Sequence, residues 1–119
     1  MTESTAPTMI RVATAAAYDV VVGRDLLGRL PGQLGDGVQR VAVVHPEDLP
    51  EPARRVSQVL SQGYDVVPLP VPSGERAKTA EVAAGCWESL GAAGLTRSDA
   101  LVAVGGGATT DLGGFVAAT

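Results

Sequence analysis

The hydrophobic residues of the chain fall into short runs separated by stretches with helical spacing. The clearest runs are 40–45, 65–70 and 100–104, and turn residues bound each of them. Apolar runs of this length are typical of strands buried on both faces of a parallel sheet. Between the runs, apolar residues recur three or four positions apart, as they do on one face of a helix. This alternation predicts an α/β fold, a Rossmann-like parallel sheet with flanking helices.

Further elements follow from residue type and spacing. Two β-type runs at 10–14 and 18–23 predict a short β-hairpin before the sheet. Pro68 and Pro70 restrict their strand to an edge of the sheet or shorten it, because proline has no N–H to donate. Helices are predicted over 25–34, 51–62, 78–90 and from a Thr109 or Thr110 cap to 119, the last with Leu112, Phe115, Val116 and Thr119 on one face.

Three consecutive glycines, Gly105 to Gly107, join the last strand to the last helix. Glycine tolerates positive φ and lets another molecule approach the backbone. The first N–H groups of the following helix lack partners, and the helix dipole favours negative charge there. The turn therefore predicts a phosphate or pyrophosphate site, and a tight turn without a ligand is the less favoured alternative. Its spacing differs from the common dinucleotide fingerprint, since Thr110 stands where the third glycine would be.

A second candidate segment is 73–78, Ser-Gly-Glu-Arg-Ala-Lys. The carboxyl ends of parallel strands share one edge, so this loop, the glycine turn and His45 are expected at one rim. Glu75 beside a glycine suits hydrogen bonding to ribose hydroxyls. Lys78 is the only lysine among nine basic residues and offers a compact ammonium. From these residues alone, an ordinary solvated helix start is the favoured explanation of both side chains.

Other residues have structural explanations. A hydrogen-bonded structural role for His45 is favoured over ligand contact, and one histidine cannot build a metal site. Cys86 and Trp87 are predicted in the core, because each shares a helical face with apolar residues. Gly113 and Gly114 each cost a helix about 1 kcal/mol relative to Ala, so close packing against a strand or cofactor is expected.

Asp111 is expected in the first turn of the last helix. A carboxylate in that turn interacts favourably with the helix dipole, which explains the residue without a ligand. As a ligand contact, it would repel a pyrophosphate and should face a ribose or substrate hydroxyl instead.

Composition narrows the classes of function. The formal net charge is −4 and no basic cluster occurs, which argues against nucleic acid and anionic membrane as partners. No apolar run is long enough to span a membrane, and the first residues lack the features of a signal peptide, so a cytoplasmic protein is expected. Cys86 is the only cysteine, which excludes an internal disulfide and a cysteine-based metal cluster.

The length of 119 residues suits one domain. Residues 1–8 are expected to be a disordered start and 9–119 a nucleotide-binding domain. The last predicted helix has no glycine stop, basic last turn or following proline. We therefore expect the chain to be the amino-terminal part of a longer protein, with its nucleotide-binding domain incomplete.

Several of these stretches together resemble 3-dehydroquinate synthase and its sugar-phosphate cyclase relatives. The resemblance rests on Gly74-Glu75 with Lys78, on 90–100 and on Val104-Gly-Gly-Gly-Ala-Thr-Thr-Asp-Leu-Gly-Gly-Phe-Val-Ala-Ala118. The pattern Gly-Gly-Gly-x-x-x-Asp-x-x-Gly-Phe after Arg-x-Asp is quite specific to this family. The Ala108-Thr-Thr110 variant is similar to its actinobacterial members. The likeness covers 73–119 well, and 9–72 by the order of strands and helices.

The resemblance implies an NAD- and metal-dependent lyase of the shikimate pathway, which leads to chorismate and the aromatic amino acids. It would convert 3-deoxy-D-arabino-heptulosonate 7-phosphate, a phosphorylated sugar acid, to 3-dehydroquinate and phosphate. Ser73 stands where an acidic residue is common in the family. The NAD contacts that the resemblance implies are Ser73, Gly74, Glu75, Arg76, Ala77, Lys78, Gly105, Gly106, Gly107, Ala108, Thr109, Thr110 and Asp111.

The resemblance also implies what the chain lacks. The family's ligands for a divalent metal (zinc or cobalt), a glutamate and two histidines, lie beyond Thr119, as do its basic substrate-binding residues. No catalytic or metal-binding residue is therefore expected in the chain, which should be inactive alone, and the full-length protein is expected to be a homodimer. Two alternatives stay open: a related sugar-phosphate cyclase of secondary metabolism, and a nucleotide-binding module without chemistry.

Overall fold

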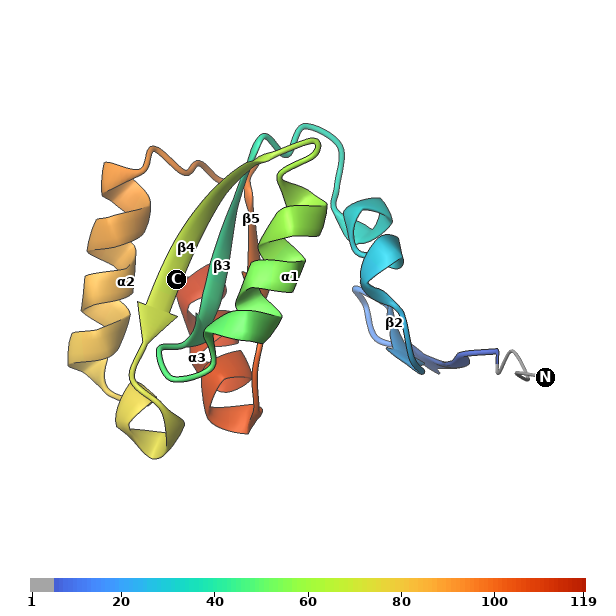
Figure 1. Ribbon diagram of the computed structural model, residues 1–119, viewed down its shortest axis with the longest axis horizontal. Coiled ribbons are helices and arrows are strands. Elements are labelled where there is room, and N and C mark those ends of the chain that lie inside the picture. The colour runs from blue at the N-terminus through green and yellow to red at the C-terminus, as the bar shows by residue number, and fades with distance from the viewer. Residues whose placement is uncertain (1–5) are drawn as a thin grey trace.

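The computed structural model describes residues 6–119 (Figure 1). Of the expected disordered start at 1–8, residues 1–5 lie outside the described part, and Thr8 begins the first strand. In chain order the elements are β1 (Thr8–Val12), β2 (Tyr18–Val22), the 3-10 turns η1 (Leu27–Arg29) and η2 (Pro31–Gln33), β3 (Arg40–Pro46), α1 (Pro50–Leu60), β4 (Asp65–Val71), the 3-10 turn η3 (Gly74–Ala77), α2 (Ala80–Ala92), β5 (Ala100–Ala103) and α3 (Gly107–Ala118).

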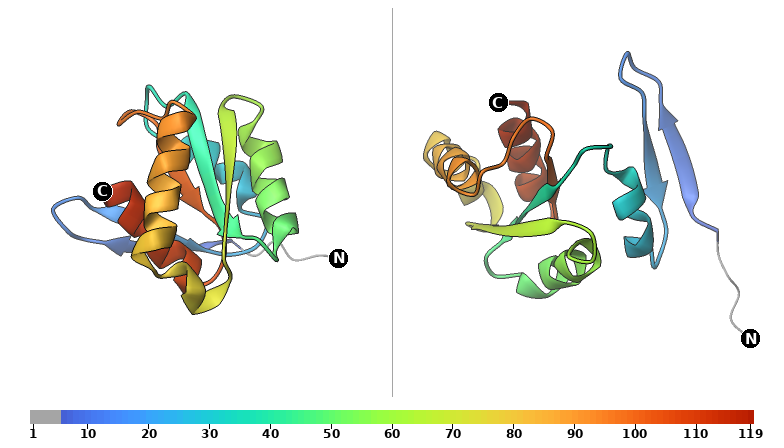
Figure 2. Two further views of the ribbon diagram at one scale, coloured as in Figure 1. Left: turned by 90° about the vertical axis from the view of Figure 1, so that its left-hand side faces the viewer. Right: turned by 90° about the horizontal axis from the view of Figure 1, so that it is seen from above.

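Three parallel strands form the main sheet, in the order β4-β3-β5. Figure 2 shows α1 on one face of this sheet and α2 and α3 on the other. The α/β class, the parallel sheet and the cover on both faces are therefore as predicted. Among residues 6–119, no helix has the length and hydropathy that crossing a membrane requires.

The central strand β3 explains why the sheet is buried on both sides. Its residues 41–44 are fully buried, and alternate side chains enter different clusters. Val41 and Val43 pack with Val56 and Leu60 of α1. On the other face, Val44 packs with buried residues of β4, α2 and α3, including Leu69, Cys86, Leu112 and Val116. Two-sided burial accounts for the continuous apolar run in the sequence, since alternation is expected only when one face meets water.

β4 lies at an edge of the described sheet, as its prolines predicted. The N–H of Asp65 points inward and donates to the carbonyl of Gln39. Alternate residues of a strand point the same way, so the nitrogens of Pro68 and Pro70 face away from β3. The missing N–H groups therefore cost the ladder nothing, and β4 extends to Val71.

The predicted helix over 25–34 is wrong, because the structure has two 3-10 turns there. In an α-helix, Pro31 could not donate to the carbonyl of Leu27, and its ring would collide with that carbonyl. Gly28 and Gly32 lower the helical propensity further. The spacing of the leucines still indicated which side chains face the interior, since Leu27, Leu30 and Leu34 pack against the cluster on the α1 side.

The β1–β2 hairpin is present as predicted, although β1 begins and ends two residues earlier than the sequence pattern suggested. Its strands pair antiparallel, with Thr8 opposite Val22 and Val12 opposite Tyr18. In the right-hand view of Figure 2, the hairpin lies apart from the main sheet, with η1 and η2 between them. Arg11 and Asp19 form an exposed ion pair across the two strands at 3.0 Å.

The aromatic residues on α2 and α3 lie differently from the prediction. Cys86 is buried as predicted, and burial raises the pKa of its thiol. Trp87, which was predicted in the core, is 43% exposed, and Phe115, which was predicted only to share a helical face with Leu112 and Val116, is 53% exposed. Their rings lie 6.2 Å apart between α2 and α3, and Trp87 donates to the hydroxyl of Thr119 at 3.0 Å. The buried face of α3 instead includes Thr109 and Gly113 beside Leu112 and Val116.

Candidate functional site

Three loops leave the carboxyl ends of the parallel strands at one edge of the sheet, the lower edge in Figure 1. They are the β3–α1 loop, the β4–α2 loop that contains η3, and the glycine turn between β5 and α3. The chain passes from β3 to β4 on one side and then returns to place β5 on the other side. Ligands of open α/β sheets bind at such a reversal point. The crevice expected from this rule lies between the ends of β3 and β5.

Gly105 fixes the path of the glycine turn. Its φ is +147°, a value that side-chain-bearing residues rarely adopt. A Cβ at this position would lie 3.1 Å from Cδ of Pro46 and 3.1 Å from Oγ1 of Thr109. The turn is therefore packed between the end of β3 and the start of α3, and it requires glycine for structural reasons.

Gly106 and Gly107 are different, because a Cβ on either would meet no protein atom within 4 Å. Their surroundings are open, which leaves the backbone accessible to a ligand. Gly106 is the N-cap of α3, and no side chain caps the helix there. The first N–H to enter the ladder of the helix belongs to Thr110, which donates to the carbonyl of Gly106 at 3.1 Å. The N–H groups of residues 107–109 precede that bond, which is the geometry of an anion site.

The predicted threonine cap is therefore wrong, because the helix begins at Gly107. Thr109 lies inside the first turn and is 2% exposed. The Thr110 hydroxyl donates back to the carbonyls of Gly107 and Gly106, at 3.1 and 3.3 Å. The earlier start also moves Asp111 out of the first turn, so the dipole argument for that carboxylate no longer applies.

Lys78 connects the loop at 73–78 to α3. Its ammonium lies 2.9 Å from a carboxylate oxygen of Asp111 and 3.7 Å from one of Glu75. The hydrogen bond and the charge of Asp111, followed by the charge of Glu75, raise the pKa of Lys78. The structure thus brings the two predicted segments into contact through one salt bridge.

The remaining members of the two segments divide by burial. Ala77 and Thr109 are buried, so their side chains face the interior. Gly74 has a φ of +64° and begins the η3 turn, which exposes Glu75 and Arg76. His45 is nearly buried, and its Nδ1 lies 2.9 Å from the carbonyl of Pro46, in agreement with a structural role.

One rim residue was missed from the sequence. Ser73 Oγ donates a hydrogen bond to the carboxylate of Asp48, which lies in the β3–α1 loop. An acidic residue two positions beyond a strand end was the available signal. Its partner lies 25 residues further along the chain. Only the parallel pairing of β3 and β4 brings the two together.

Asp99, in the family-like Arg-x-Asp pattern, lies at the opposite edge of the sheet. Its carboxylate accepts hydrogen bonds from the backbone N–H groups of Arg40, Gln39 and Thr96, at 3.0, 3.1 and 2.9 Å. These bonds, that from Arg40 first, lower the pKa of Asp99 from 3.8 to about 2. The residue joins the amino ends of β3 and β5 and therefore has a structural explanation.

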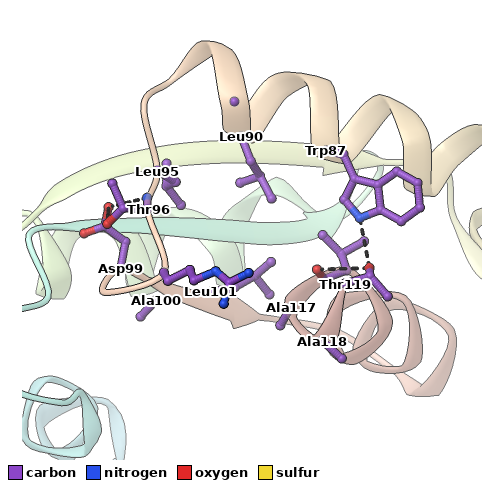
Figure 3. Close-up of a pocket in the computed structure, with 13 residues that line it drawn as sticks. Trp87, Leu90, Leu95, Thr96, Asp99, Ala100, Leu101, Ala117, Ala118 and Thr119 are labelled. Atoms are coloured by element: carbon purple, nitrogen blue, oxygen red, sulfur yellow. Dashed lines mark hydrogen bonds between the residues drawn. The ribbon is translucent and has the colours of Figure 1, made fainter.

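A wide cleft lies away from the rim. It has a volume of about 690 Å³ and lies between α2, β5 and α3, with Leu90, Leu101 and Thr119 among its lining residues (Figure 3). A second cleft of about 500 Å³ between α2 and α3 reaches Lys78 and Asp111. The glycine turn is the stronger candidate for an anion site than either cleft, because it presents backbone donors and a helix dipole at one point.

The described residues offer no metal centre, since residues 6–119 contain no group of three or more His, Cys, Asp or Glu side chains placed to hold an ion. A nucleotide phosphate, in contrast, fits the rim. The open Gly106 and Gly107 leave space for it, and the N–H groups of the uncapped helix start are suitable donors.

Comparison with known proteins adds sequence relatives. Residues 68–119 match the family model described as 3-dehydroquinate synthase N-terminal. The 3-dehydroquinate synthase of Thermobifida fusca is 60% identical over 107 residues, which cover 89% of this chain and 29% of that protein. That of Streptomyces avermitilis is 56% identical over 120 residues, covering 98% and 33%. The chain thus spans about a third of the length of these relatives.

Solved structures show the same fold. A crystal structure of 2-deoxy-scyllo-inosose synthase superposes with a TM-score of 0.84 at 22% identity, covering 94% of this chain and 33% of that one. A second structure of that enzyme, complexed with carbaglucose-6-phosphate, NAD+ and Co2+, gives the same TM-score. At this identity the likeness concerns the fold alone.

The parallel sheet with helices on both faces makes the chain a doubly wound α/β domain, and the uncapped start of α3 lies where the strand order reverses. Sequence similarity then identifies the family. The chain belongs to the 3-dehydroquinate synthase family and matches the amino-terminal part of its members.

Proposed function

We propose that the full-length protein is a 3-dehydroquinate synthase. It converts 3-deoxy-D-arabino-heptulosonate 7-phosphate to 3-dehydroquinate and phosphate in the shikimate pathway. The observation that carries the proposal is the open glycine turn at the uncapped start of α3, in a chain 60% identical to a protein of that name. Residues 9–119 form part of the NAD-binding domain.

In this proposal the rim binds NAD. The N–H groups of residues 107–109 hold the pyrophosphate, because they lack partners in the helix and lie at the positive end of its dipole. The loop at 73–78 borders the ribose, and Lys78 holds Asp111 so that its carboxylate does not face the phosphates uncompensated. NAD, when bound, supplies reversible oxidation of one substrate hydroxyl, which acidifies a neighbouring proton and permits loss of phosphate.

The rest of the chemistry belongs to parts of the protein outside this chain. A divalent metal, zinc or cobalt, and the basic residues that bind the sugar phosphate come from the carboxy-terminal domain. NAD and Co2+ accompany the structural neighbour, which supports this pairing of cofactors without identifying the metal here. We further propose that the full-length protein is a cytoplasmic homodimer.

Phosphate release tests the function directly. The full-length protein, supplied with NAD, a divalent metal and the heptulosonate phosphate, should release phosphate and form 3-dehydroquinate. The 119-residue chain should release none under the same conditions. Turnover by the chain alone would refute its dependence on the rest of the protein. Absence of 3-dehydroquinate from the full-length reaction would refute the assigned substrate.

A further inference from the structure

The β1–β2 hairpin gathers most of the exposed apolar side chains of the described residues. Eight large hydrophobic residues among 6–119 are exposed, and five of them lie on this hairpin. The strand pairing places six residues on one side of it, the outward face: Thr8, Ile10, Val12, Tyr18, Val20 and Val22. Ile10, Tyr18 and Val22 are each exposed over half of their surface or more. A contiguous apolar patch of this kind marks an interaction site.

The alternation of apolar and polar residues in the hairpin is reversed. The other face contains the Arg11–Asp19 ion pair. Asp19 and Val21 line a cleft with Leu27 and Leu30 of the 3-10 turns, so this face is turned towards the main sheet. An antiparallel sheet with one buried face normally places its apolar residues inward and its polar residues outward. In this hairpin the outward face is the more apolar one, and its burial is what the sequence favours.

We propose that the outward face packs against the outward face of a second copy of this chain and forms the apolar centre of a homodimer interface. The inference rests on the homodimer proposed above and identifies its surface. None of the six side chains is charged, so two copies meet about a two-fold axis without placing like charges opposite each other.

The dimensions of the hairpin suit such a contact. Each strand has five residues, a length of about 17 Å. An isolated two-stranded hairpin is marginally stable, and stacking two of them makes a four-stranded sandwich in which both outward faces are buried. A typical interface buries about 800 Å² on each partner, more than one hairpin face provides. The surfaces around the hairpin therefore supply the polar rim of the interface.

The position of the hairpin favours a second copy over another part of the same protein. The carboxy-terminal domain of the proposed function has to meet the rim, where the NAD site lies. The hairpin is separated from the main sheet by η1 and η2 and contributes no loop to the rim (Figure 2). These turns pack with α1 on one face of the sheet, whereas α3 packs on the other. The outward face points away from both turns and is free for a partner.

Sedimentation equilibrium of the full-length protein tests the proposal. Ile10→Arg should raise the dissociation constant of the dimer at least about a hundredfold, because the interface would bury two unpaired like charges. Met9→Arg is the matched control and should leave that constant unchanged. Met9 is 58% exposed against 50% for Ile10, but its side chain lies on the other face. An equimolar mixture of the Ile10→Arg and Ile10→Glu proteins should dimerise again, because opposite charges then meet across the interface.

The outcomes separate this inference from the proposed function. If the unmodified full-length protein is a monomer, the proposed homodimer and this inference fail together, and phosphate release still tests the enzymatic activity separately. If it is a dimer and Ile10→Arg leaves the dissociation constant unchanged, only the hairpin interface is overturned. A lower thermal unfolding midpoint at an unchanged oligomeric state would show that the same protein covers the face, and would also overturn the inference. Failure of the mixture to dimerise would attribute the effect of Ile10→Arg to misfolding and overturn it likewise.

Discussion

The ammonium of Lys78 lies 2.9 Å from the carboxylate of Asp111, and the pair joins the loop after β4 to the second turn of α3. Both side chains are well exposed, at 38% and 65%, so the pair contributes little to the stability of the fold. Its effect is positional. It keeps the two rim segments together and balances a negative charge close to the proposed pyrophosphate site.

Replacing Lys78 by Met should therefore separate binding from stability. We expect NAD affinity to fall at least tenfold, because Asp111 then repels the pyrophosphate, while the thermal unfolding midpoint changes little. Lys78→Arg should restore binding only in part, since a planar guanidinium does not occupy the place of a compact ammonium. Calorimetry and thermal unfolding of the full-length protein measure the two effects. Arg54→Met, at another exposed ion pair, is the control, and unchanged NAD affinity in Lys78→Met would contradict the assignment.

The glycine turn gives a second prediction. Gly106→Val and Gly107→Val should abolish NAD binding with little loss of fold, because each added side chain enters the open space beside the helix start. Gly63→Val, at the other end of the sheet, also meets no atom within 4 Å at its Cβ and should leave binding intact. NAD titration with circular dichroism distinguishes the sites. Full NAD affinity in both rim variants would exclude the turn as the pyrophosphate site.

Two adjacent glycines of α3 predict opposite changes in stability. A Cβ on Gly113 would lie 2.8 Å from Cβ of Ala103, so Gly113→Ala should overpack the interface with β5 and cost about 1–3 kcal/mol. A Cβ on Gly114 would meet no atom within 4 Å, so Gly114→Ala should stabilise the helix by up to about 1 kcal/mol. Urea unfolding of both variants provides the comparison. Equal changes in the two free energies of unfolding would contradict the packing described for α3.

Asp99 predicts a pH dependence of stability. Its pKa is about 2 in the folded protein and 3.8 without the backbone hydrogen bonds. The folded value is the lower one, so ionised Asp99 stabilises the fold above pH 3.8, and the contribution is lost as the pH falls towards 2.

Asp99→Asn should therefore be less stable than the unmodified chain near neutral pH, and the difference should narrow between about pH 4 and pH 2. Urea unfolding across that range measures it. Glu88→Gln on the surface of α2 should show no such narrowing. A difference between Asp99→Asn and the unmodified chain that stays constant with pH would show that the carboxylate does not act through its charge.

Elements whose evidence is local were predictable from the sequence. The apolar runs identified β3, β4 and β5, and the prolines placed β4 at an edge. The prediction of a helix over 25–34 is wrong because leucine spacing indicates which side chains are buried, whereas Pro31 prevents the backbone from continuing as a regular α-helix. The threonine cap of α3 failed because Gly106 can begin the helix without a side-chain bond.

Contacts between distant segments were the least predictable part of the candidate site. The sequence placed Lys78 and Asp111 at one rim but did not show that they touch. Asp48 was not identified at all, because its bond to Ser73 depends on the pairing of β3 with β4. The exposure of Trp87 likewise depends on how α2 packs beside α3, and helical spacing does not contain that information.

The prolines of β4 have a consequence for the sheet as a whole. Its outer edge lacks the N–H donors of Pro68 and Pro70, so a strand approaching from that side would find only part of a ladder. The edge of β5 contains no proline and borders an open cleft (Figure 3). A strand that joined this sheet would therefore find an uninterrupted row of backbone donors only at the β5 edge, because Pro68 and Pro70 interrupt that row at the β4 edge.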